Sequence, residues 1–390
     1  MHKVYADTTK PCNRIVTNYC HQIVQQYLGY NIGIPVTYEV DDEVRDILDY
    51  NDVIEKDNLF LRNALIYGKA FELQYLDVDK KDRFDVIDTR YGIDVYGDEL
   101  SADELKYFIR LTCVDTIGQD KWRAEVYDKD NIYIYKATGK LTNLTLENTL
   151  RHNYGQVPVT VLSLNPEQES IFAQVMSLQD AYNTLVSSET DDWEAFVDAY
   201  LVLKGVTADD DDIADMRTNR VLILDPDSSA DYLTKQINDS QIENMLDNIK
   251  QNIYKMSNCP DFSDREFMAQ SGIALQYKLV GFSNVSRAIM NRMEKALRKR
   301  LELITGIEAL KGTEFTDATI SFSENIPANT LDTANVINQL RGIVSNRTLL
   351  SLLPFIEDPD LELENLKTEQ QANMELYDFG ISKDGEDDEA

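Results

Sequence analysis

Two neighbouring side chains, Cys20 and His21, are of the types that could form a nucleophile and its base. A thiol becomes nucleophilic when an adjacent imidazole removes its proton. The apolar pattern around them predicts a helix over residues 13–28, and consecutive helical residues point to different sides of the helix. We therefore expect both residues to be structural, and we expect the same of the other histidines, His2 and His152.

A run of four acidic residues, Asp209 to Asp212, could ligate a divalent cation through carboxylate oxygens. The run lacks the alternating spacing and the glycine of an EF-hand loop. We therefore predict a solvated acidic loop and assign no metal ligand. The alternative from another class of protein is a metal-dependent nuclease or phosphodiesterase, whose carboxylates would be spread over several strands.

The sequence contains none of the short motifs that we associate with a defined catalytic mechanism. There is no G-x-x-x-x-G-K-[ST], no G-x-S-x-G, no H-E-x-x-H and no glycine-rich dinucleotide turn after a strand. The pair Gly68-Lys69 is isolated and does not make a phosphate-binding loop. We assign no catalytic residue and no cofactor, and the sequence indicates a structural or mechanical protein rather than an enzyme.

Length and composition narrow the class of protein further. The chain has 390 residues, a net charge of −31 and 43% hydrophobic residues, which predicts two or three domains with a sizeable core. Four cysteines without C-x-x-C spacing argue against disulfides and zinc and fit a reducing compartment. We expect no membrane span and no secretion signal, because no apolar run is long enough. The acidic composition argues against tight binding of nucleic acid, because neutralising the phosphates needs clustered Lys and Arg.

The hydrophobic periodicity predicts an α+β fold in which helices flank an antiparallel, strand-rich segment. Helices are predicted over residues 13–28, 41–67, 167–200, 242–256, 271–305, 327–340 and 358–377. Strands are predicted over residues 36–38, 71–76, 84–87, 106–114, 122–127, 132–135, 157–162 and 319–322, with a further pair at 201–205 and 221–224. We expect Trp122 and Trp193 in the core.

The longest predicted helix, residues 271–305, organises the chain. It contains no proline, and at 1.5 Å per residue it would be roughly 50 Å long. Steps of three and four residues place its apolar side chains on one stripe: Phe282, Val285, Ile289, Met293, Ala296 or Leu297, Leu301 and Ile304. We expect a helix of this length to form a strut or a bundle, or to help build an oligomer.

The same helix carries six basic residues in a strongly acidic chain. We call them the basic cluster: Arg287, Arg292, Lys295, Arg298, Lys299 and Arg300. The ordinary explanation is that cations near a helix C-terminus complement the helix dipole and pair with acidic neighbours. The alternative is that the cluster faces a partner.

Several stretches form an ordered pattern over nearly the whole chain. They are NRIV at 13–16, GYNIGIPVTY at 29–38, ALIYGKAFE at 64–72, DAYN at 180–183, FVDAYLVLKG at 196–205, SGIAL at 271–275 and RGIVSNRTLLSLLPF at 341–355. Together they resemble the portal proteins of tailed double-stranded-DNA bacteriophages, in the siphophage-type family. Two features depart from the family's pattern: the lead before Asn13 is short, as in a shortened or divergent member, and so is the segment at 306–326.

This resemblance implies a dodecameric ring at one vertex of the virion capsid, assembled in the host cytoplasm. The implied parts are a wing (1–257), a loop and first stem helix (258–305), a clip (306–326), a second stem helix (327–342), a tunnel loop (343–356), and a crown helix with an acidic tail (357–390). The implied partners are further copies of the chain, the terminase large subunit, the scaffold and major capsid proteins, a head-completion or adaptor protein, and double-stranded DNA, with no membrane.

The resemblance also implies which residues lie nearest the DNA. These are the tunnel-loop residues Ser345, Asn346, Arg347, Thr348, Leu349 and Leu352. An acidic channel would repel the duplex and keep it centred, whereas each basic contact to a phosphate would add a barrier to movement. We therefore expect the basic cluster to pair with acids of a neighbouring subunit, with weak DNA contacts as the alternative. An oligomeric scaffold that does not handle DNA is a further reading of the long helices.

Overall fold

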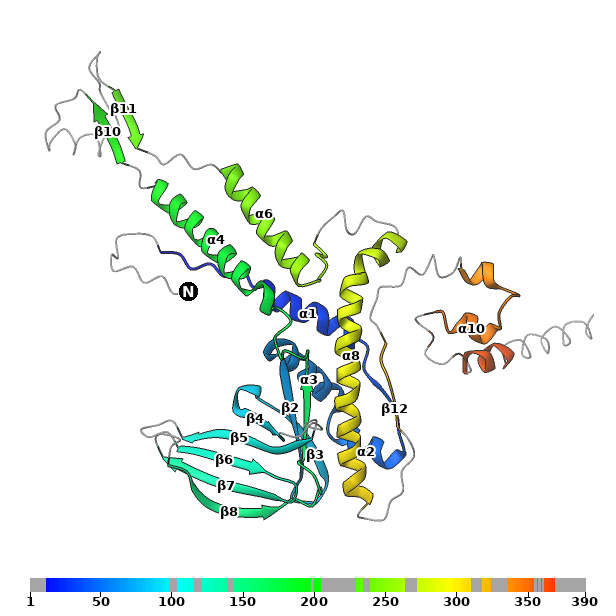
Figure 1. The fold of residues 1–390 in the computed structure, drawn as a ribbon. Helices are drawn as coiled ribbons and strands as arrows, with labels where there is room; N and C mark the ends of the chain where they lie inside the picture. Colours follow the sequence, from blue (N-terminus) through cyan, green and yellow to red (C-terminus); the bar gives the residue numbers. More distant parts are fainter. Residues whose placement is uncertain are drawn as a thin grey trace, which may run out of the picture. The chain divides into compact units, whose positions relative to one another are not determined.

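The computed structural model describes residues 12–97, 104–115, 121–138, 143–197, 200–204, 229–233, 239–263, 272–309, 318–323, 336–353, 356, 359 and 361–368. The chain divides into two compact units, Met1–Asn325 and Ile326–Ala390, and each is treated by itself. Helices and strands are mixed along the chain, which confirms the α+β class (Figure 1).

The described part of the first unit contains both helices and strands. Its described helices are α1 (Tyr19–Ile32), α2 (Asp42–Tyr50), α3 (Val53–Tyr67), α4 (Met176–Val197), α6 (Asp239–Met256) and α8 (Gly272–Ala309), with 3-10 helices η1 (Thr89–Tyr91) and η2 (Ala173–Val175). Its described strands are β1 (Thr37–Glu39), β2 (Lys69–Leu76), β3 (Asp82–Ile87), β4 (Gly92–Tyr96), β5 (Leu105–Asp115), β6 (Lys121–Tyr127), β7 (Asn131–Thr138), β8 (Thr145–Arg151), β9 (Val159–Ser163), β10 (Tyr200–Lys204), β11 (Ser229–Leu233) and β12 (Thr319–Ser321).

Two larger sheets and two small ones organise these strands, and all the described pairings are antiparallel. The order is β3-β2-β9 in the three-stranded sheet and β4-β5-β6-β7-β8 in the five-stranded sheet, while β1 pairs with β12 and β10 with β11. The predicted partner of the strand at 201–205 is wrong: β10 pairs with residues 229–233, and residues 221–224 lie outside the described part of the chain.

Two of the predicted helices have boundaries that differ from those expected from the apolar pattern. The predicted helix over 41–67 is two helices, because Asp52 adopts a left-handed conformation with a φ of 52° between α2 and α3. The predicted helix over 13–28 begins only at Tyr19, where Asn18 caps it by accepting a hydrogen bond from the N–H of His21. Residues 12–18 carry no helix.

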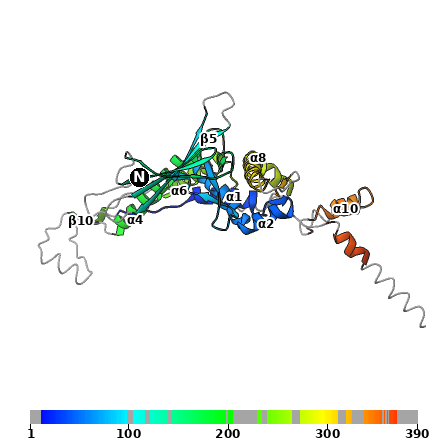
Figure 2. The same ribbon diagram turned by 90° about the horizontal axis from the view of Figure 1, so that it is seen from below.

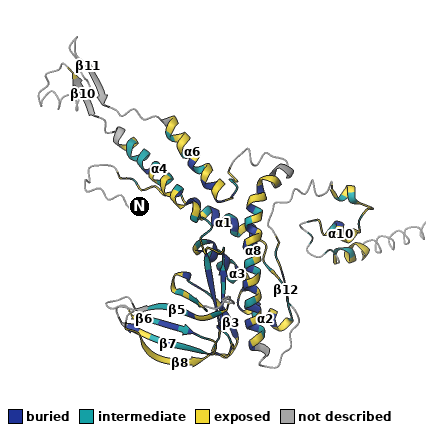
Figure 3. Cartoon of the chain, viewed as in Figure 1, coloured by how far each residue is buried: buried dark blue, intermediate teal, exposed yellow. Residues whose placement is uncertain are grey.

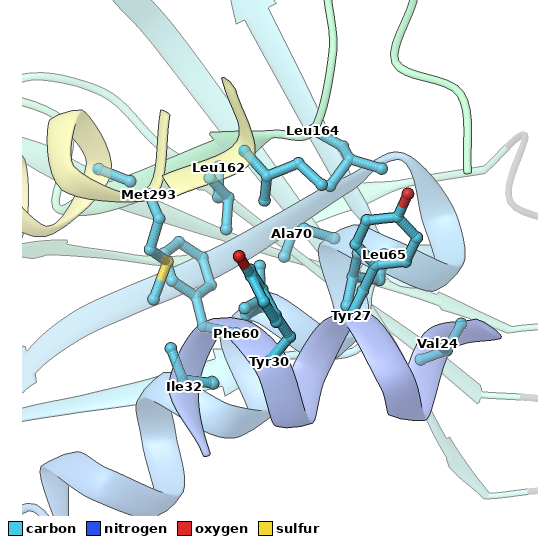
Figure 4. Close-up of a cluster of buried hydrophobic side chains, with 14 of the residues drawn as sticks. Val24, Tyr27, Tyr30, Ile32, Phe60, Leu65, Ala70, Leu162, Leu164 and Met293 are labelled. Carbon is cyan, nitrogen blue, oxygen red and sulfur yellow. The ribbon is translucent and has the colours of Figure 1, made fainter. Parts of the chain in front are cut away.

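The main core of the first unit lies where α1, α3 and α8 meet β2 and β9 (Figure 4). Phe282 of α8 packs against Tyr27 and Tyr30 of α1, with ring centroids 4.5 and 4.8 Å apart. Phe60 and Met293 are completely buried in the same cluster. Burying a side chain of this size contributes about 1.5–3 kcal/mol, so this cluster fixes α8 against the rest of the unit.

Helix α8 confirms the long predicted helix and continues past its predicted end. It has 38 residues and is therefore about 57 Å long. Figure 2 views it nearly along its axis as one continuous coil. Residues 306–309, at the start of the segment expected to form a clip, are the last residues of this helix. The clip assignment itself stays a prediction.

One face of the five-stranded sheet packs on the three-stranded sheet. Phe108 lies 5.0 Å from Phe71 between ring centroids, and Gly92 makes room for this contact, because a Cβ there would lie 2.6 Å from the Phe71 ring. The sequence pattern did not predict β4 or β8. The expectation that both tryptophans are core residues is wrong, since Trp193 is 51% exposed and Trp122 is only half-buried.

The second unit contains short helical pieces in its described part. Helix α10 (Asn346–Leu350) lies between further helical residues at 336–340 and 361–368. Gly342 follows the first of these pieces with a φ of 86°, a conformation that glycine adopts without strain. The predicted helix over 327–340 is thus described only in its last turn.

Candidate functional site

Five members of the basic cluster lie on the outer and flanking sides of α8. Arg287, Lys295 and Arg298 are exposed, and Arg292 and Lys299 are half-buried. Arg298 forms an ion pair with Glu294 one turn earlier, and Lys299 forms one with Glu302. Pairs of this kind contribute about 0.3–0.5 kcal/mol. For Arg298 and Lys299, pairing with acidic neighbours on the same helix therefore explains the positive charge, and it contributes little to stability.

Arg300 is the exception in the cluster, because its side chain is 0% exposed. Its Nε and Nη2 donate to the two carboxylate oxygens of Glu72 at 2.7 Å each, and its Nη1 donates to Asp57 Oδ1 at 2.6 Å. The expectation that Arg300 contacts a neighbouring subunit or DNA is therefore wrong. Its donors are already used inside its own chain.

A tyrosine and a phenylalanine complete the surroundings of the guanidinium. Tyr38 Oη donates to Asp57 Oδ2 at 2.7 Å and accepts from Arg300 Nη1 at 3.2 Å. The guanidinium carbon lies 4.6 Å from the centroid of the Phe84 ring, a cation–π geometry. We call Arg300, Glu72, Asp57 and Tyr38 the junction network, and it joins α8, β2, α3 and β1.

Burial dominates the electrostatics of the junction network. It raises the pKa of the Glu72 carboxyl, with Arg300 acting in the opposite direction, and it raises the pKa of the Tyr38 phenol. Burial alone would lower the pKa of Arg300, but the Glu72 and Asp57 carboxyls outweigh it and raise that pKa well above its ordinary value. The two-point contact with Glu72 is the geometry of a guanidinium on an ionised carboxylate.

Gly68 sets how the two acidic residues approach α8. It joins α3, which carries Asp57, to β2, which carries Glu72. Its φ is 80°, and a Cβ at this position would lie 2.0 Å from the backbone oxygen of Gln168. The stretch at 64–72 is therefore a tight passage from helix to strand that places both carboxylates beside one arginine.

The sequence pattern contained a signal for this network that was missed. Arg300 lies three residues after Leu297 and four before Ile304, so it occupies a position on the apolar stripe of α8. A charged residue on a buried stripe requires a buried partner. Glu72 was missed for a different reason: alternation in β2 suggested a half-buried strand, whereas residues 70–74 are all buried.

A second contact joins two of the stretches on which the family resemblance rests. Residues 13–18 and Tyr19, the first residue of α1, lie along α4. The backbone N–H of every second one donates to a side chain of α4, and each acceptor lies about one turn nearer the start of that helix than the one before. The pairs are Asn13 with Asp191, Ile15 with Ser187, Thr17 with Asn183, and Tyr19 with Gln179. Two residues of extended chain advance about 6.6 Å and one helical turn about 5.4 Å, so the two repeats stay nearly in step.

The predicted tunnel-loop residues fall in and around α10. Ser345 caps this helix by accepting a hydrogen bond from the N–H of Thr348, and residues 345–348 are exposed. Leu349 is only 5% exposed, so its assignment as a DNA-facing residue is wrong in this unit, whereas Leu352 is 41% exposed. The assignment of the exposed residues as a tunnel loop stays a prediction.

The remaining candidates show no activated group among the described residues. Burial raises the pKa of the Cys20 thiol, and it raises the pKa of the Cys259 thiol to about 12, the opposite of what a nucleophile needs. Asp209 to Asp212 lie outside the described ranges. Within those ranges no three His, Cys, Asp or Glu residues cluster as metal ligands would, and no helix has the length and apolar character to cross a membrane.

Comparison with known proteins gives one consistent result. Residues 1–376 match the family described as phage portal protein, SPP1 Gp6-like. The portal protein of Bacillus phage SPP1 is 24% identical over 416 aligned residues, which cover 98% of this chain and 81% of the relative. The portal protein of Clostridium phage phiCD119 is 20% identical over 393 residues, which cover 92% of this chain and 85% of the relative.

Proposed function

Since this chain belongs to the SPP1 Gp6-like family of phage portal proteins, we propose that it forms a dodecameric ring around a DNA channel at one capsid vertex. The observation that carries the proposal is the family match over residues 1–376, nearly the whole chain. Proteins of this family are structural components of the phage head, and DNA would pass through the ring during packaging and ejection.

We assign the parts of the ring from their order in the chain. Residues 1–257 form the wing, and α8 forms the first stem helix. The length of α8 and its buried stripe support this assignment. The clip then spans residues 310–326, followed by the second stem helix (327–342), the tunnel loop (343–356) and the crown (357–390). The pairing of β12 with β1 means that the proposed clip includes a strand bound to the wing.

The charge distribution supports a conduit that does not retain DNA. A net charge of −31 per copy repels a polyanion, so a duplex meets few sites at which it would stall. The exposed Arg287 and Lys295 lie on one helix of each copy. We propose that they meet acidic groups of the neighbouring copy, because ring contacts join two different surfaces of the same chain.

The proposed partners follow from the position of such a ring. The terminase large subunit would dock at the clip during packaging, and a head-completion or adaptor protein would replace it afterwards. The scaffold and the major capsid protein would contact the wing. A virion location at the capsid vertex, after assembly in the host cytoplasm, completes this proposal.

Native mass spectrometry of the purified chain, with negative-stain images of the same sample, tests the ring. We expect closed rings of about a dozen copies with an axial hole. A compact dimer with a cleft would overturn the proposal. The alternative of a metal-dependent nuclease predicts DNA cleavage with Mg²⁺ or Mn²⁺, whereas a portal ring should leave the DNA intact.

The tunnel-loop assignment has its own test. Leu352→Asp places a charge on an exposed loop residue, and we expect rings to form while DNA packaging in infected cells falls at least tenfold. Leu366→Asp, at a residue that is 39% exposed in the helical piece 361–368, is the matched control and should package normally. Normal packaging by Leu352→Asp would refute the assignment.

A further inference from the structure

The five-stranded sheet has one face whose larger side chains join no buried cluster of the described residues. Residues paired directly across antiparallel strands point to the same face of the sheet. The register therefore places on one face Ile93 of β4, Tyr107 and Ile109 of β5, Trp122 of β6, Tyr135 of β7 and Leu146 of β8. We call this the bare face.

The larger apolar side chains at the centre of the sheet differ in burial between its two faces, although the small Ala124 and Ala137 of the bare face are buried. Phe108 and Tyr127, which point to the opposite face, are buried in a cluster with Phe71. On the bare face Ile93, Tyr107 and Leu146 are 47%, 46% and 55% exposed, and its other members are half-buried. None of them belongs to a buried cluster of the described residues. Figure 3 shows the exposed strand β8 at the edge of this sheet.

The central part of the bare face carries no charge, in a chain in which 27% of the residues are charged. Arg151, which pairs with Asn131, lies on the same face at its end. The paired rows through Ile93, Leu111 and Trp122 place no Asp, Glu, Lys or Arg on it. A single arginine at one end does not make a surface for nucleic acid, which needs clustered Lys and Arg. An exposed apolar surface of this kind marks an interaction site.

We propose that the bare face is a contact surface between neighbouring copies of this chain, an inference that rests on the ring proposed above. Two copies that each carry a net charge of −31 repel one another, and the repulsion is least where the two surfaces that meet carry no acidic residue. Five strands about 4.8 Å apart make a face on the order of 400 Å². That is roughly half of the 800 Å² that a stable contact buries on each partner, so other elements must add to it in the ring.

A pair of variants on one strand tests the face directly. Strand β8 has one extra residue between Leu146, which pairs with Tyr135, and Asn148, which pairs with Ile134. Because Tyr135 and Ile134 point to opposite faces, Leu146 lies on the bare face and Asn148 on the opposite face. Both residues are exposed, so Leu146→Glu and Asn148→Glu add the same charge to the same strand. We expect Leu146→Glu to raise the protein concentration needed for half-assembly at least tenfold, and Asn148→Glu to leave it unchanged.

The outcomes separate this inference from the proposed ring. If wild-type chain forms no ring, the ring proposal fails. If wild type and both variants form rings equally well, the ring stands and the bare face is not the contact between copies. If both variants assemble poorly, the charge acts through the edge of β8 and the assignment of the face is wrong. Tyr107→Glu is the second variant, should Leu146→Glu fail to fold, and the same loss of assembly is expected.

A measurement that leaves the face unaltered completes the test. The chain has two tryptophans, and Trp193→Phe leaves Trp122 on the bare face as the only one. We expect acrylamide quenching of Trp122 fluorescence to fall at least twofold when monomers assemble into rings. Quenching that is equal in monomer and ring would overturn the inference, because the tryptophan would remain open to solvent in the assembled protein.

Discussion

The junction network and the ion pairs of the five-stranded sheet have inverse compositions. In the junction one guanidinium, that of Arg300, lies between two carboxylates. In the sheet one carboxylate, that of Glu125, lies 3.3 Å from Arg110 and 2.9 Å from Arg123. A tyrosine hydroxyl donates to an acid in each group, and Tyr127 does so to Glu125 at 2.8 Å.

The difference between the two groups is their access to water. The Arg300 and Glu72 side chains are 0% exposed, whereas those of Arg110 and Arg123 are 40% and 43% exposed. Water screens an exposed pair, which contributes about 0.2–1 kcal/mol. Removing one partner of a buried pair leaves an unpaired charge and costs about 3–5 kcal/mol. Similar lists of contacts therefore predict very different consequences.

The largest effect is expected from Arg300→Ala. The change leaves Glu72 buried without its cation and removes the contact with Phe84, so the free energy of unfolding should fall by about 3–5 kcal/mol. Urea unfolding of the monomer at low protein concentration measures it. Adding Glu72→Gln to the same chain should recover part of the loss, because the unpaired charge is gone. Equal stability of the single variant and wild type would contradict the burial argument.

The next effect concerns the turn that brings the two carboxylates together. Gly68→Ala would place a Cβ against the backbone of Gln168 in a left-handed conformation, and we expect a loss of roughly 2–4 kcal/mol. Gly306→Ala is the control, because nothing lies within 4 Å of a Cβ at this position in α8. It should be neutral or slightly stabilising. The two unfolding midpoints, compared by calorimetry, test the prediction.

Hydrophobic patterns in the sequence predicted most of the helices and strands, but not all of them. The apolar stripe predicted α8, and alternation predicted β5, β6 and β7. Alternation also located β2, but it did not predict that residues 70–74 are buried on both faces. The polar segment TLENTLR did not predict β8, because that strand buries no face of its own. Residues 13–18 looked helical, but the side chains of α4 satisfy their backbone groups instead.

The candidate site was harder to predict than the fold. Arg300 looked like its neighbours in the basic cluster, and only its position on the stripe distinguishes it. The burial of Trp122 could not be read from its type, because aromatic residues occupy cores and contact surfaces alike. Glu72 and Asp57 come together through the turn at Gly68, a tertiary arrangement that local patterns do not contain.

Glu125→Gln should have a smaller effect than the junction variant, although the carboxylate again has several partners. Glutamine keeps the size of the side chain and removes the charge, while Arg110 and Arg123 can turn to water. We expect a loss of about 1–2 kcal/mol, measured by urea unfolding beside Arg300→Ala. A loss as large as that of Arg300→Ala would show that exposure of the two arginines does not reduce the effect.

His152, which follows β8, tests burial of a neutral group in the same sheet. Its Nδ1 accepts from the Tyr154 N–H, so Nε2 donates to the Asp128 carbonyl at 2.9 Å. Burial lowers the pKa of His152 below its ordinary 6.5. As the pH falls, the histidine of the unfolded chain is therefore protonated before that of the folded chain. The stabilisation that neutral His152 gives to the folded chain is complete above pH 6.5 and is lost as the pH falls toward the lowered pKa.

The slope of this loss can reach at most about 1.4 kcal/mol per pH unit. His152→Gln should flatten the dependence of unfolding free energy on pH below about pH 6.5. The wild-type chain, measured under the same conditions, gives the reference slope. A His152→Gln chain with an unchanged slope would assign the pH dependence to other groups.

The smallest effect is expected two residues before the largest. Arg298→Ala removes an ion pair with Glu294 whose arginine side chain is 56% exposed, so the unfolding free energy should change by no more than about 0.5 kcal/mol. High salt should abolish even this difference, while the Arg300→Ala defect should persist because water and ions do not reach the junction. A large salt-resistant loss in Arg298→Ala would mean that the outer side of α8 is covered in solution, as a subunit contact would cover it. Measuring both variants as monomer and as ring therefore separates what α8 does within one chain from what it does between chains.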